Sequence, residues 1–453
     1  MRYVSTRGST PELSFDDVLL EGLAVDGGLY VPAEWPRFDL GEAASYAEVA
    51  AAVIRPFVTG SVVEDRLEAL LTETYVRFRH PDVAPLREIQ PGRWLLELFW
   101  GPTLSFKDYA LSFVGAAFDA VLTERDGWVT VLGATSGDTG SAAIDALAGL
   151  DSVQVVILYP QGRVSDVQRR QMTTVSAPNV HAVAVEGTFD DCQALVKQAF
   201  GSAELRSRYQ LAAVNSINWG RVMAQAAYYA WTGSHIGGPF DVAVPTGNFG
   251  NVLAAEVARR GGVPVQRLVV GTNANHGLVD IIDTGRARTS EVMATIAPAM
   301  DIQVPSNFER YLFELVDRDA ARVREVMRLL TTDGMLVLDE TAHARLQDRF
   351  AGHWYDAAQI EDAISTVHRE TGEILDPHTA IGWMAGSAEH RERPMVSVAT
   401  AHPAKFPEAV QRATGVVPSL PDDLADLMDR PERFRTIPPG LAAVEAVLAE
   451  LLP

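Results

Sequence analysis

From residue 94 onward, short apolar runs alternate with longer stretches in which apolar residues recur at helical spacing. The short runs are rich in valine and isoleucine and show little alternation between apolar and polar residues. This pattern is typical of strands covered on both faces, as in a parallel sheet with crossover helices. The predicted strands span residues 128–132, 153–159, 180–185, 241–244, 267–270 and 394–398. The chain is therefore predicted to have an α/β fold.

The two ends of the chain show different patterns. Residues 1 to about 93 predict a cap of short elements, with a helix over 46–58 and a proline-marked loop around 81–91. Residues 440–452 predict an amphipathic helix whose apolar face packs on the core or docks on a surface. Because 453 residues are too many for one core, two or three packed units are expected.

Composition restricts the partners and the compartment. The net charge is −21, from 38 basic and 59 acidic residues. Nucleic acid and anionic membranes repel such a charge, so neither is expected as a partner, and an anionic ligand needs local amides and a few focused cations. No apolar run approaches the roughly 20 residues that span a bilayer. The single cysteine, Cys192, fits a reducing compartment, and a cytoplasmic protein is expected.

Loops after the predicted strands carry unusual chemistry, and ligands of open α/β folds bind at the carboxyl ends of strands. The loop over 133–141 combines glycines with small hydroxyl residues before a helical segment. Free N–H groups at such a helix N-terminus suit a carboxylate or phosphate, although ordinary capping gives the same pattern. The loop over 244–251 holds Gly247 and Gly250, which let consecutive amides converge on an anion. An ordinary left-handed turn is the alternative there.

Three further side chains are candidates. Lys107 lies in an apolar segment bounded by glycine and proline. Burial lowers the pKa of such an amine and makes it a nucleophile or base, whereas a lysine that extends to solvent is the ordinary alternative. Thr400 follows a predicted strand, where a hydroxyl can meet a ring nitrogen, unless it is an ordinary β-branched strand residue. Arg221 is placed to meet an anionic substrate group, unless it is a surface ion-pair partner.

Several other kinds of site are disfavoured. The ten histidines show no metal-ligand spacing, and the lysine of a nucleotide-triphosphate loop is missing from 244–251. A secluded lysine, a glycine loop for a phosphate and a second loop for a carboxylate together describe a pyridoxal phosphate site. The lysine forms the Schiff base, one loop holds the cofactor phosphate and the other holds an amino-acid carboxylate. Pyridoxal 5′-phosphate is therefore the expected cofactor, with no metal.

Ordered segments along nearly the whole chain resemble the threonine synthases. The resemblance is to their longer type, with an extra N-terminal domain, within the tryptophan synthase β-like class of pyridoxal phosphate enzymes. The matching segments are 3–8, 22–32, the Lys107 segment, 133–140, 158–165, 187–192, 215–221, 247–251, 298–301, 306–310 and 400–406.

The resemblance implies fold type II, with two α/β domains and parallel-rich sheets plus an N-terminal cap domain. The expected units are residues 1–93, a smaller mobile domain over 94–235 with Lys107 at its interface, and a larger cofactor-phosphate-binding domain over 236–453. The domains of this class interleave along the chain. The long type is often monomeric, so a monomer or weak dimer is expected.

The resemblance also implies roles around the cofactor. Lys107 carries the cofactor and, once released, moves protons. The phosphate-holding residues are Gly247, Asn248, Phe249, Gly250 and Asn251. Thr400 faces the pyridine nitrogen. Asp138 stands where related enzymes often have asparagine beside the 3′-oxygen, and an acid there repels a phenolate unless a proton is shared.

On the substrate side, the resemblance implies that Thr135, Ser136 and Thr139 meet the α-carboxylate and that Ser216 and Arg221 meet the substrate phosphate. The implied reaction is γ-replacement, which converts O-phospho-L-homoserine and water into L-threonine and phosphate. The alternative is a paralogue that eliminates phosphate to give 2-oxobutyrate, or that uses a different donor or nucleophile.

The chain departs from the family pattern at three positions expected near the substrate side. Trp100 replaces a usual histidine, His276 replaces a usual aspartate, and Gly220 replaces a usual alanine. These changes are either drift compensated by neighbouring residues or the mark of an altered donor or acceptor.

Overall fold

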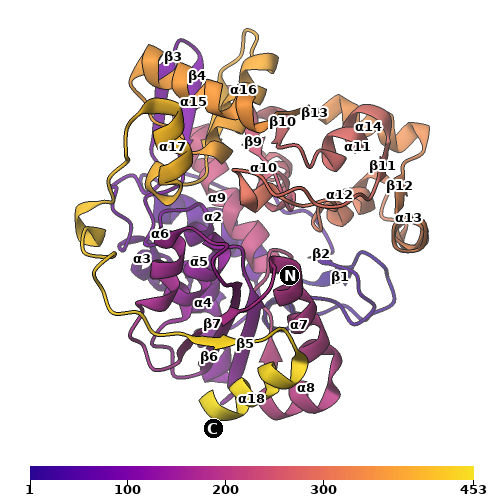
Figure 1. The fold of residues 1–453 in the computed structure, drawn as a ribbon. Coiled ribbons are helices and arrows are strands. Elements are labelled where there is room, and N and C mark those ends of the chain that lie inside the picture. The colour runs from indigo at the N-terminus through magenta and orange to yellow at the C-terminus, as the bar shows by residue number, and fades with distance from the viewer. Residues whose placement is uncertain (453) are drawn as a thin grey trace.

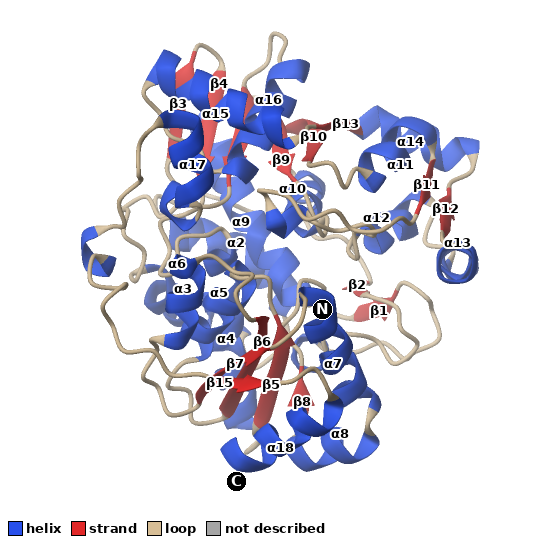
Figure 2. Cartoon of the chain, viewed as in Figure 1, coloured by secondary structure: helices blue, strands red, loops and turns tan. Residues whose placement is uncertain are grey.

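The computed structural model describes residues 1–452 and contains two large sheets, in the lower and upper halves of Figures 1 and 2. The first sheet has the order β15-β7-β6-β5-β8, and all its strand pairs are parallel. Its strands are β5 (Val129–Ala134), β6 (Val153–Pro160), β7 (Val180–Val185), β8 (Leu211–Ala212) and β15 (Arg435–Ile437). The predicted strands over 128–132, 153–159 and 180–185 are confirmed.

The second sheet has the order β13-β10-β9-β14-β4-β3 and is parallel except for the β3–β4 pair. Its strands are β3 (Leu86–Gln90), β4 (Arg93–Glu97), β9 (Phe240–Pro245), β10 (Val265–Thr272), β13 (Phe350–Trp354) and β14 (Met395–Ala399). The remaining three predicted strands are confirmed here. Strand β9 is buried at every position, as expected for a strand covered on both faces. The predicted α/β fold class is confirmed.

Helices cover both sheets. Those near the first sheet are α4 (Lys107–Glu124), α5 (Asp138–Leu147), α6 (Asp166–Thr173), α7 (Phe189–Gly201), α8 (Ala203–Tyr209) and α18 (Leu441–Leu451). Those near the second are α9 (Trp219–Ile236), α10 (Gly250–Gly261), α15 (Ala357–Thr371), α16 (Pro377–Glu389) and α17 (Pro407–Thr414). Helix α9 packs on α2, α4 and α10 and is buried along most of its length, so it is the central helix of the molecule.

The N-terminal segment forms the antiparallel pair β1 (Tyr3–Ser5) and β2 (Tyr30–Pro32), with one helix between these strands and two after them that pack on α4 and α9. These helices are α1 (Phe15–Glu21), α2 (Tyr46–Val58) and α3 (Leu67–Tyr75). The predicted helix over 46–58 is confirmed, and it begins at a capping box between Ser45 and Glu48.

A lobe on the right of Figure 1 packs beside the β13 edge of the second sheet. It contains the antiparallel pair β11–β12 and a group of short helices. These elements are α11 (Gly277–Thr284), β11 (Arg286–Arg288), α12 (Phe308–Leu315), α13 (Ala320–Asp333), β12 (Met335–Val337) and α14 (Glu340–Arg349). Four short 3-10 helices complete the chain, at Glu64–Arg66, Pro298–Met300, Pro403–Lys405 and Asp422–Leu424.

Strand pairing crosses the expected domain division in two places. Strand β4, at the start of the predicted 94–235 unit, pairs with β14 in the second sheet. Strand β15, near the end of the chain, pairs with β7 in the first sheet. The predicted C-terminal helix is confirmed as α18, which buries Val444 and Leu448 and packs on α7. The units therefore interleave, and their boundaries at 93 and 235 stay a prediction.

Candidate active site

A cavity of about 1000 Å³ opens between the carboxyl end of β5 and the loops that follow β9 and β14. Because β5 belongs to the first sheet and the other two strands belong to the second, the cavity lies between the two sheets. Every predicted site residue lines it: Lys107, Thr135, Ser136, Asp138, Thr139, Ser216, Arg221, Gly247, Asn248, Phe249, Gly250, Asn251 and Thr400. Their individual roles stay predictions.

Lys107 is the first residue of α4, and only 8% of its surface is exposed. The residues before it pair with those after β14. The Phe106 N–H donates to the Thr400 carbonyl at 2.9 Å, and the His402 N–H donates to the Leu104 carbonyl at 3.0 Å. This pairing brings Lys107 and Thr400 to the same wall. Burial lowers the pKa of the Lys107 amine, although the nearby Asp138 carboxylate opposes that effect.

Asp138 lies between two lysines, and these three residues with Gln168 form what we call the Asp138 cluster. Asp138 Oδ2 is 3.2 Å from Lys107 Nζ, and Oδ1 is 2.9 Å from Lys405 Nζ. Gln168 donates to Oδ1 at 2.8 Å. Burial alone would raise the pKa of the Asp138 carboxyl, but the two ammonium charges outweigh it and hold the pKa below its usual range. Asp138 is therefore a carboxylate with partners on both oxygens.

The loop before α10 is fixed from both sides. Phe249 adopts a left-handed conformation, with φ of 64°, and its ring packs against Phe308 and Phe350. A Cβ at Gly247 would lie 2.5 Å from the carbonyl oxygen of Ala299, so only glycine fits. The first N–H groups of α10 have no partner within the helix, and Gly250 and Asn251, with which the helix begins, line the cavity.

Asn251 adds a side-chain donor to this loop. Its Oδ1 accepts hydrogen bonds from the hydroxyls of Tyr228, at 3.0 Å, and Tyr229. Its buried Nδ2 has no hydrogen-bond partner among residues 1–452. A buried N–H₂ group held in place by two tyrosines and left without an acceptor fits a phosphate oxygen. The loop therefore offers hydrogen-bond donors that suit a cofactor phosphate.

Arg221 is a buried cation without a counter-charge in the described chain. Only 4% of its surface is exposed, and its Nε and Nη1 make no hydrogen bond to residues 1–452. Burial lowers the pKa of its guanidinium to about 10, so it stays protonated near neutral pH. A buried charge of this kind needs an opposite charge, which a bound anion supplies.

The loop after β5 is braced by Thr135. Its Oγ1 accepts hydrogen bonds from the N–H groups of Gly137, at 3.0 Å, and Gly140, at 2.8 Å. The hydroxyl proton of Thr135 is then left to donate to another group. Gly137 has a φ of 136°, and a Cβ there would lie within 2.6 Å of Gln168. Ser136 and Thr139 line the cavity from the same turn.

The segment that carries Ser216 is tied to the N-terminal part of the chain. Asn218 donates to the Leu19 carbonyl at 2.8 Å, and Asn307 donates to the Ser216 carbonyl at 2.9 Å. The buried Arg310 bridges the carbonyls of Tyr30 and Ile217 at 2.8 and 2.6 Å. The N-terminal segment therefore helps to hold the segment that carries Ser216 in place.

Sequence reasoning missed three residues near the site. Lys405 and Gln168 contact Asp138, and His378 lines the cavity beside Thr400. His378 shares Asp376 with the helix cap of α16, with Nδ1 2.8 Å from the carboxylate. The Asp-Pro pair that starts α16 is a recognisable cap signal, but nothing local to these residues indicates that they lie at a ligand site.

The three departures from the family pattern were expected near the substrate, and none of them lines the cavity. Trp100 donates from Nε1 to Glu97 at 2.9 Å. His276 stacks on Trp354, with ring centres 4.8 Å apart, and contacts Asp280. Trp100 and His276 find their partners outside the cavity, whereas Gly220 directly precedes Arg221, and the nearness of the three positions to the substrate stays a prediction.

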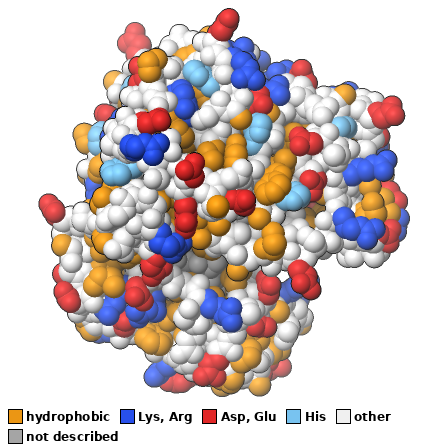
Figure 3. Space-filling model, turned by 45° about the horizontal axis from the view of Figure 1, so that its top comes forward, with side chains coloured by type: hydrophobic (Ala, Val, Ile, Leu, Met, Phe, Trp, Pro, Cys, Tyr) orange, Lys and Arg blue, Asp and Glu red, His pale blue; other side chains and the backbone are white. Residues whose placement is uncertain are grey.

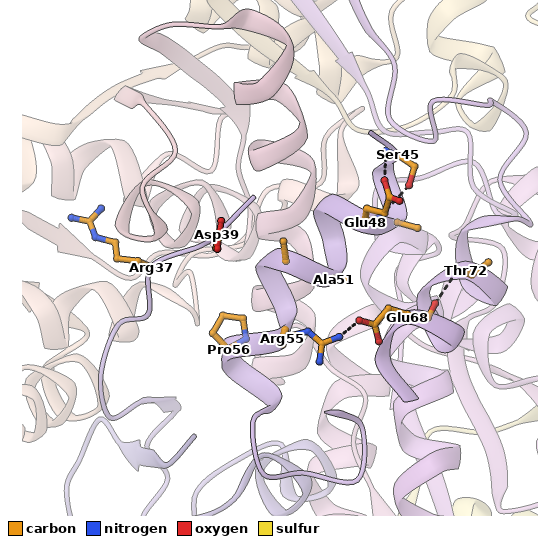
Figure 4. Close-up of a pocket in the computed structure, with 11 residues that line it drawn as sticks. Arg37, Asp39, Ser45, Glu48, Ala51, Arg55, Pro56, Glu68 and Thr72 are labelled. Carbon is orange, nitrogen blue, oxygen red and sulfur yellow. Dashed lines mark hydrogen bonds and ion pairs between the residues drawn. The ribbon is translucent and has the colours of Figure 1, made fainter. Parts of the chain in front are cut away.

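A second hollow, of about 760 Å³, lies over α2 and is shown in Figure 4. Several of its polar side chains have partners in the protein: Arg55 pairs with Glu68, and Glu48 accepts from the Ser45 backbone at 2.9 Å. No cation there is buried and unpartnered in the part of the chain that the structure describes. The contrast with Arg221 favours the cavity between the sheets as the candidate ligand site.

Features other than the cavity also bear on function: the charge on one face of the surface, the grouping of metal-ligating side chains and the apolar character of the helices. On the face shown in Figure 3, basic side chains occur in small groups among acidic ones. Within residues 1–452, no set of His, Cys, Asp and Glu side chains is arranged to hold a metal. Over the same residues, no helix has the length and apolar character needed to cross a membrane.

The fold and the cavity define a pyridoxal-phosphate-dependent enzyme of fold type II. The family profile described as "Pyridoxal-phosphate dependent enzyme" matches residues 85–349. The profiles "Threonine synthase N terminus" and "Threonine synthase, C-terminal" match residues 2–75 and 379–448. The chain belongs to the threonine synthase family, as the sequence resemblance predicted.

Individual relatives agree over the full length. The threonine synthase of Pseudomonas aeruginosa is 46% identical and covers 99% of this chain and 98% of its own length. The pyridoxal-phosphate-bound threonine synthase structure from Brucella melitensis is 44% identical, with a TM-score of 0.97 over 100% of this chain and 99% of that one. The yeast threonine synthase structure is 35% identical, with a TM-score of 0.93 over 100% and 98%.

Proposed function

We propose that this chain converts O-phospho-L-homoserine and water into L-threonine and phosphate, with pyridoxal 5′-phosphate as its cofactor. The observation that carries the proposal is the cavity itself, in which a buried lysine lies between two separate places for anions. Membership of the threonine synthase family supports the same reaction.

The cofactor supplies an electron sink that acidifies protons near the amino-bearing carbon of a bound amino acid. In this proposal Lys107 binds it covalently, and the 247–251 loop holds its phosphate. The unpartnered Asn251 Nδ2 and the free amides at the start of α10 support that position. Thr400 meets the ring nitrogen through its hydroxyl, and Asp138 lies near Lys107 as a carboxylate already paired with Lys405.

The substrate phosphate goes to Arg221 and Ser216 in this proposal. Arg221 has two N–H groups without partners, and a phosphate dianion offers acceptors to both in a buried setting. The substrate carboxylate goes to Thr135, Ser136 and Thr139 at the start of α5. The free hydroxyl proton of Thr135 and the helix N-terminus both favour a negative group there.

Lys107 moves the protons. Its flexible stem lets one amine reach several carbons of the substrate in turn, which a carboxylate on a short stem does less well. Burial favours the uncharged form that accepts a proton. Closure of the smaller unit, predicted over 94–235, would exclude bulk water until the addition step. A monomer or weak dimer remains the expected assembly.

The test is the identity of the product. Purified protein is incubated with pyridoxal phosphate and O-phospho-L-homoserine, and threonine, 2-oxobutyrate and phosphate are quantified together. Threonine and phosphate in equal amounts support the proposal. Phosphate with 2-oxobutyrate indicates the eliminating alternative, and no release of phosphate indicates a different donor.

A further inference from the structure

Lysine is rare in this chain. Only three of the 38 basic residues are lysines, at positions 107, 197 and 405. Lys107 and Lys405 are buried, and both contact the carboxylate of Asp138. A chain that uses arginine almost everywhere thus has the compact ammonium group at both positions that face Asp138. Lys197 is exposed.

Lys405 connects the two sheets through Asp138. It follows β14 of the second sheet, whereas Asp138 begins α5, directly after β5 of the first sheet. Lys405 is fully buried, and its Nζ donates to the Thr103 carbonyl at 2.7 Å as well as pairing with Asp138. The pair therefore fixes Asp138 relative to the segment that leads into Lys107.

The charges around Lys107 come from three elements. Asp138 at the start of α5 favours the protonated amine, whereas Lys405 from the 3-10 helix and Arg221 from α9 oppose it. Lys405 itself faces Asp138, with the Asp108 carboxyl and the His402 ring also in its vicinity. Without Lys405, Asp138 would have Lys107 as its only cationic partner, and the proton on Lys107 would be held more tightly.

We propose that Lys405 is a positioning residue for Lys107: it anchors Asp138 between the sheets and neutralises that carboxylate, so that the released Lys107 amine can give up its proton. This inference rests on the proposed role of Lys107 as the group that moves protons.

Four proteins test it: wild type, Lys405→Met, Asp138→Asn and the double variant. For each loaded enzyme, kcat is measured against pH, and the visible absorbance is titrated with pH. Lys405→Met moves the acidic limb of kcat upward by about one pH unit, with about tenfold lower kcat on that limb. Asp138→Asn moves the limb downward, and the double variant returns it close to wild type. The KM for substrate stays within about twofold in Lys405→Met, since Lys405 does not line the cavity.

If Lys405 had only a structural role, Lys405→Met would lower kcat by the same factor at every pH and would not shift the acidic limb. That result overturns the proposal. If Lys405→Met does not fold, the comparison of Asp138→Asn with the double variant decides, because equal midpoints in those two mean that the Lys405 charge has no effect. The absorbance titration gives the same ordering without turnover. Borohydride reduction followed by mass spectrometry tests the proposed function separately: a cofactor label on a residue other than Lys107 overturns that function instead.

Discussion

The cavity has two charged regions, the Asp138 cluster and Arg221, which differ in whether protein side chains supply the opposite charge. In the Asp138 cluster, the carboxylate has a partner on each oxygen and both lysines are held to it. At Arg221, the guanidinium is just as deeply buried, yet two of its nitrogens have no partner in the described chain. An unpartnered buried charge costs stability, so it is expected where a ligand brings the counter-charge. The paired cluster instead adjusts the proton affinity of a group that stays in the protein.

The largest expected effect comes from replacing Lys107 in the Asp138 cluster. Lys107→Ala removes the amine that binds the cofactor and moves protons, so we expect loss of the visible cofactor absorbance and at least a 10³-fold lower kcat. Lys197→Ala is the matched control, because Lys197 is an exposed lysine on the rim of the same cavity. Absorbance retained in Lys107→Ala would contradict the assignment, and absorbance lost in both variants would show that the loss is not specific to Lys107.

The next prediction is that loss of a cation lowers the free energy of unfolding in the Asp138 cluster but raises it at Arg221. Lys405→Met leaves the buried Asp138 with one cation fewer, and we expect it to lower the free energy of unfolding by about 3 kcal/mol. Arg221→Met removes an unpartnered buried charge, and we expect it to raise that free energy by on the order of 1 kcal/mol. Both are measured by denaturant unfolding in phosphate-free buffer. Destabilisation by both substitutions would mean that Arg221 has an internal partner after all.

Arg221→Met also has an expected effect on substrate binding. Losing charge-assisted hydrogen bonds to the substrate phosphate should raise KM for O-phospho-L-homoserine by about 10- to 100-fold. With the cofactor bound, so that its phosphate fills the 247–251 loop, inorganic phosphate should raise the melting temperature of the wild type but not of this variant, because only a protein that binds the anion is stabilised by it. Arg206→Met is the control, since Arg206 lines the cavity as an exposed arginine. Equal KM changes in both variants would remove Arg221 from the phosphate site.

Local patterns predicted much of this arrangement but not the pairing across the cavity. The valine-rich strands and the glycine loops were recognisable because each carries its signal in a few adjacent residues. Strand β15 was missed because it is three residues long and mostly exposed, and β13 because glycine interrupts its apolar run. Lys405 was missed for a different reason. Its partners are Asp138 and the Thr103 carbonyl, which lie far away in sequence, and one sequence carries no sign of that contact.

The smallest expected effect comes from the departures that lie outside the cavity. Neither Trp100→His nor His276→Asp removes a side chain that lines it, so we expect kcat, KM and the threonine-to-2-oxobutyrate ratio to stay within about twofold. His276→Asp places an acid at the N-cap of α11, where capping of the helix N–H groups opposes the repulsion from Asp280, so we expect the free energy of unfolding to change by less than about 1 kcal/mol. A changed product ratio in either variant would show that residues beyond the cavity wall select the reaction. It would also mean that the contrast between the Asp138 cluster and Arg221 does not describe the whole site.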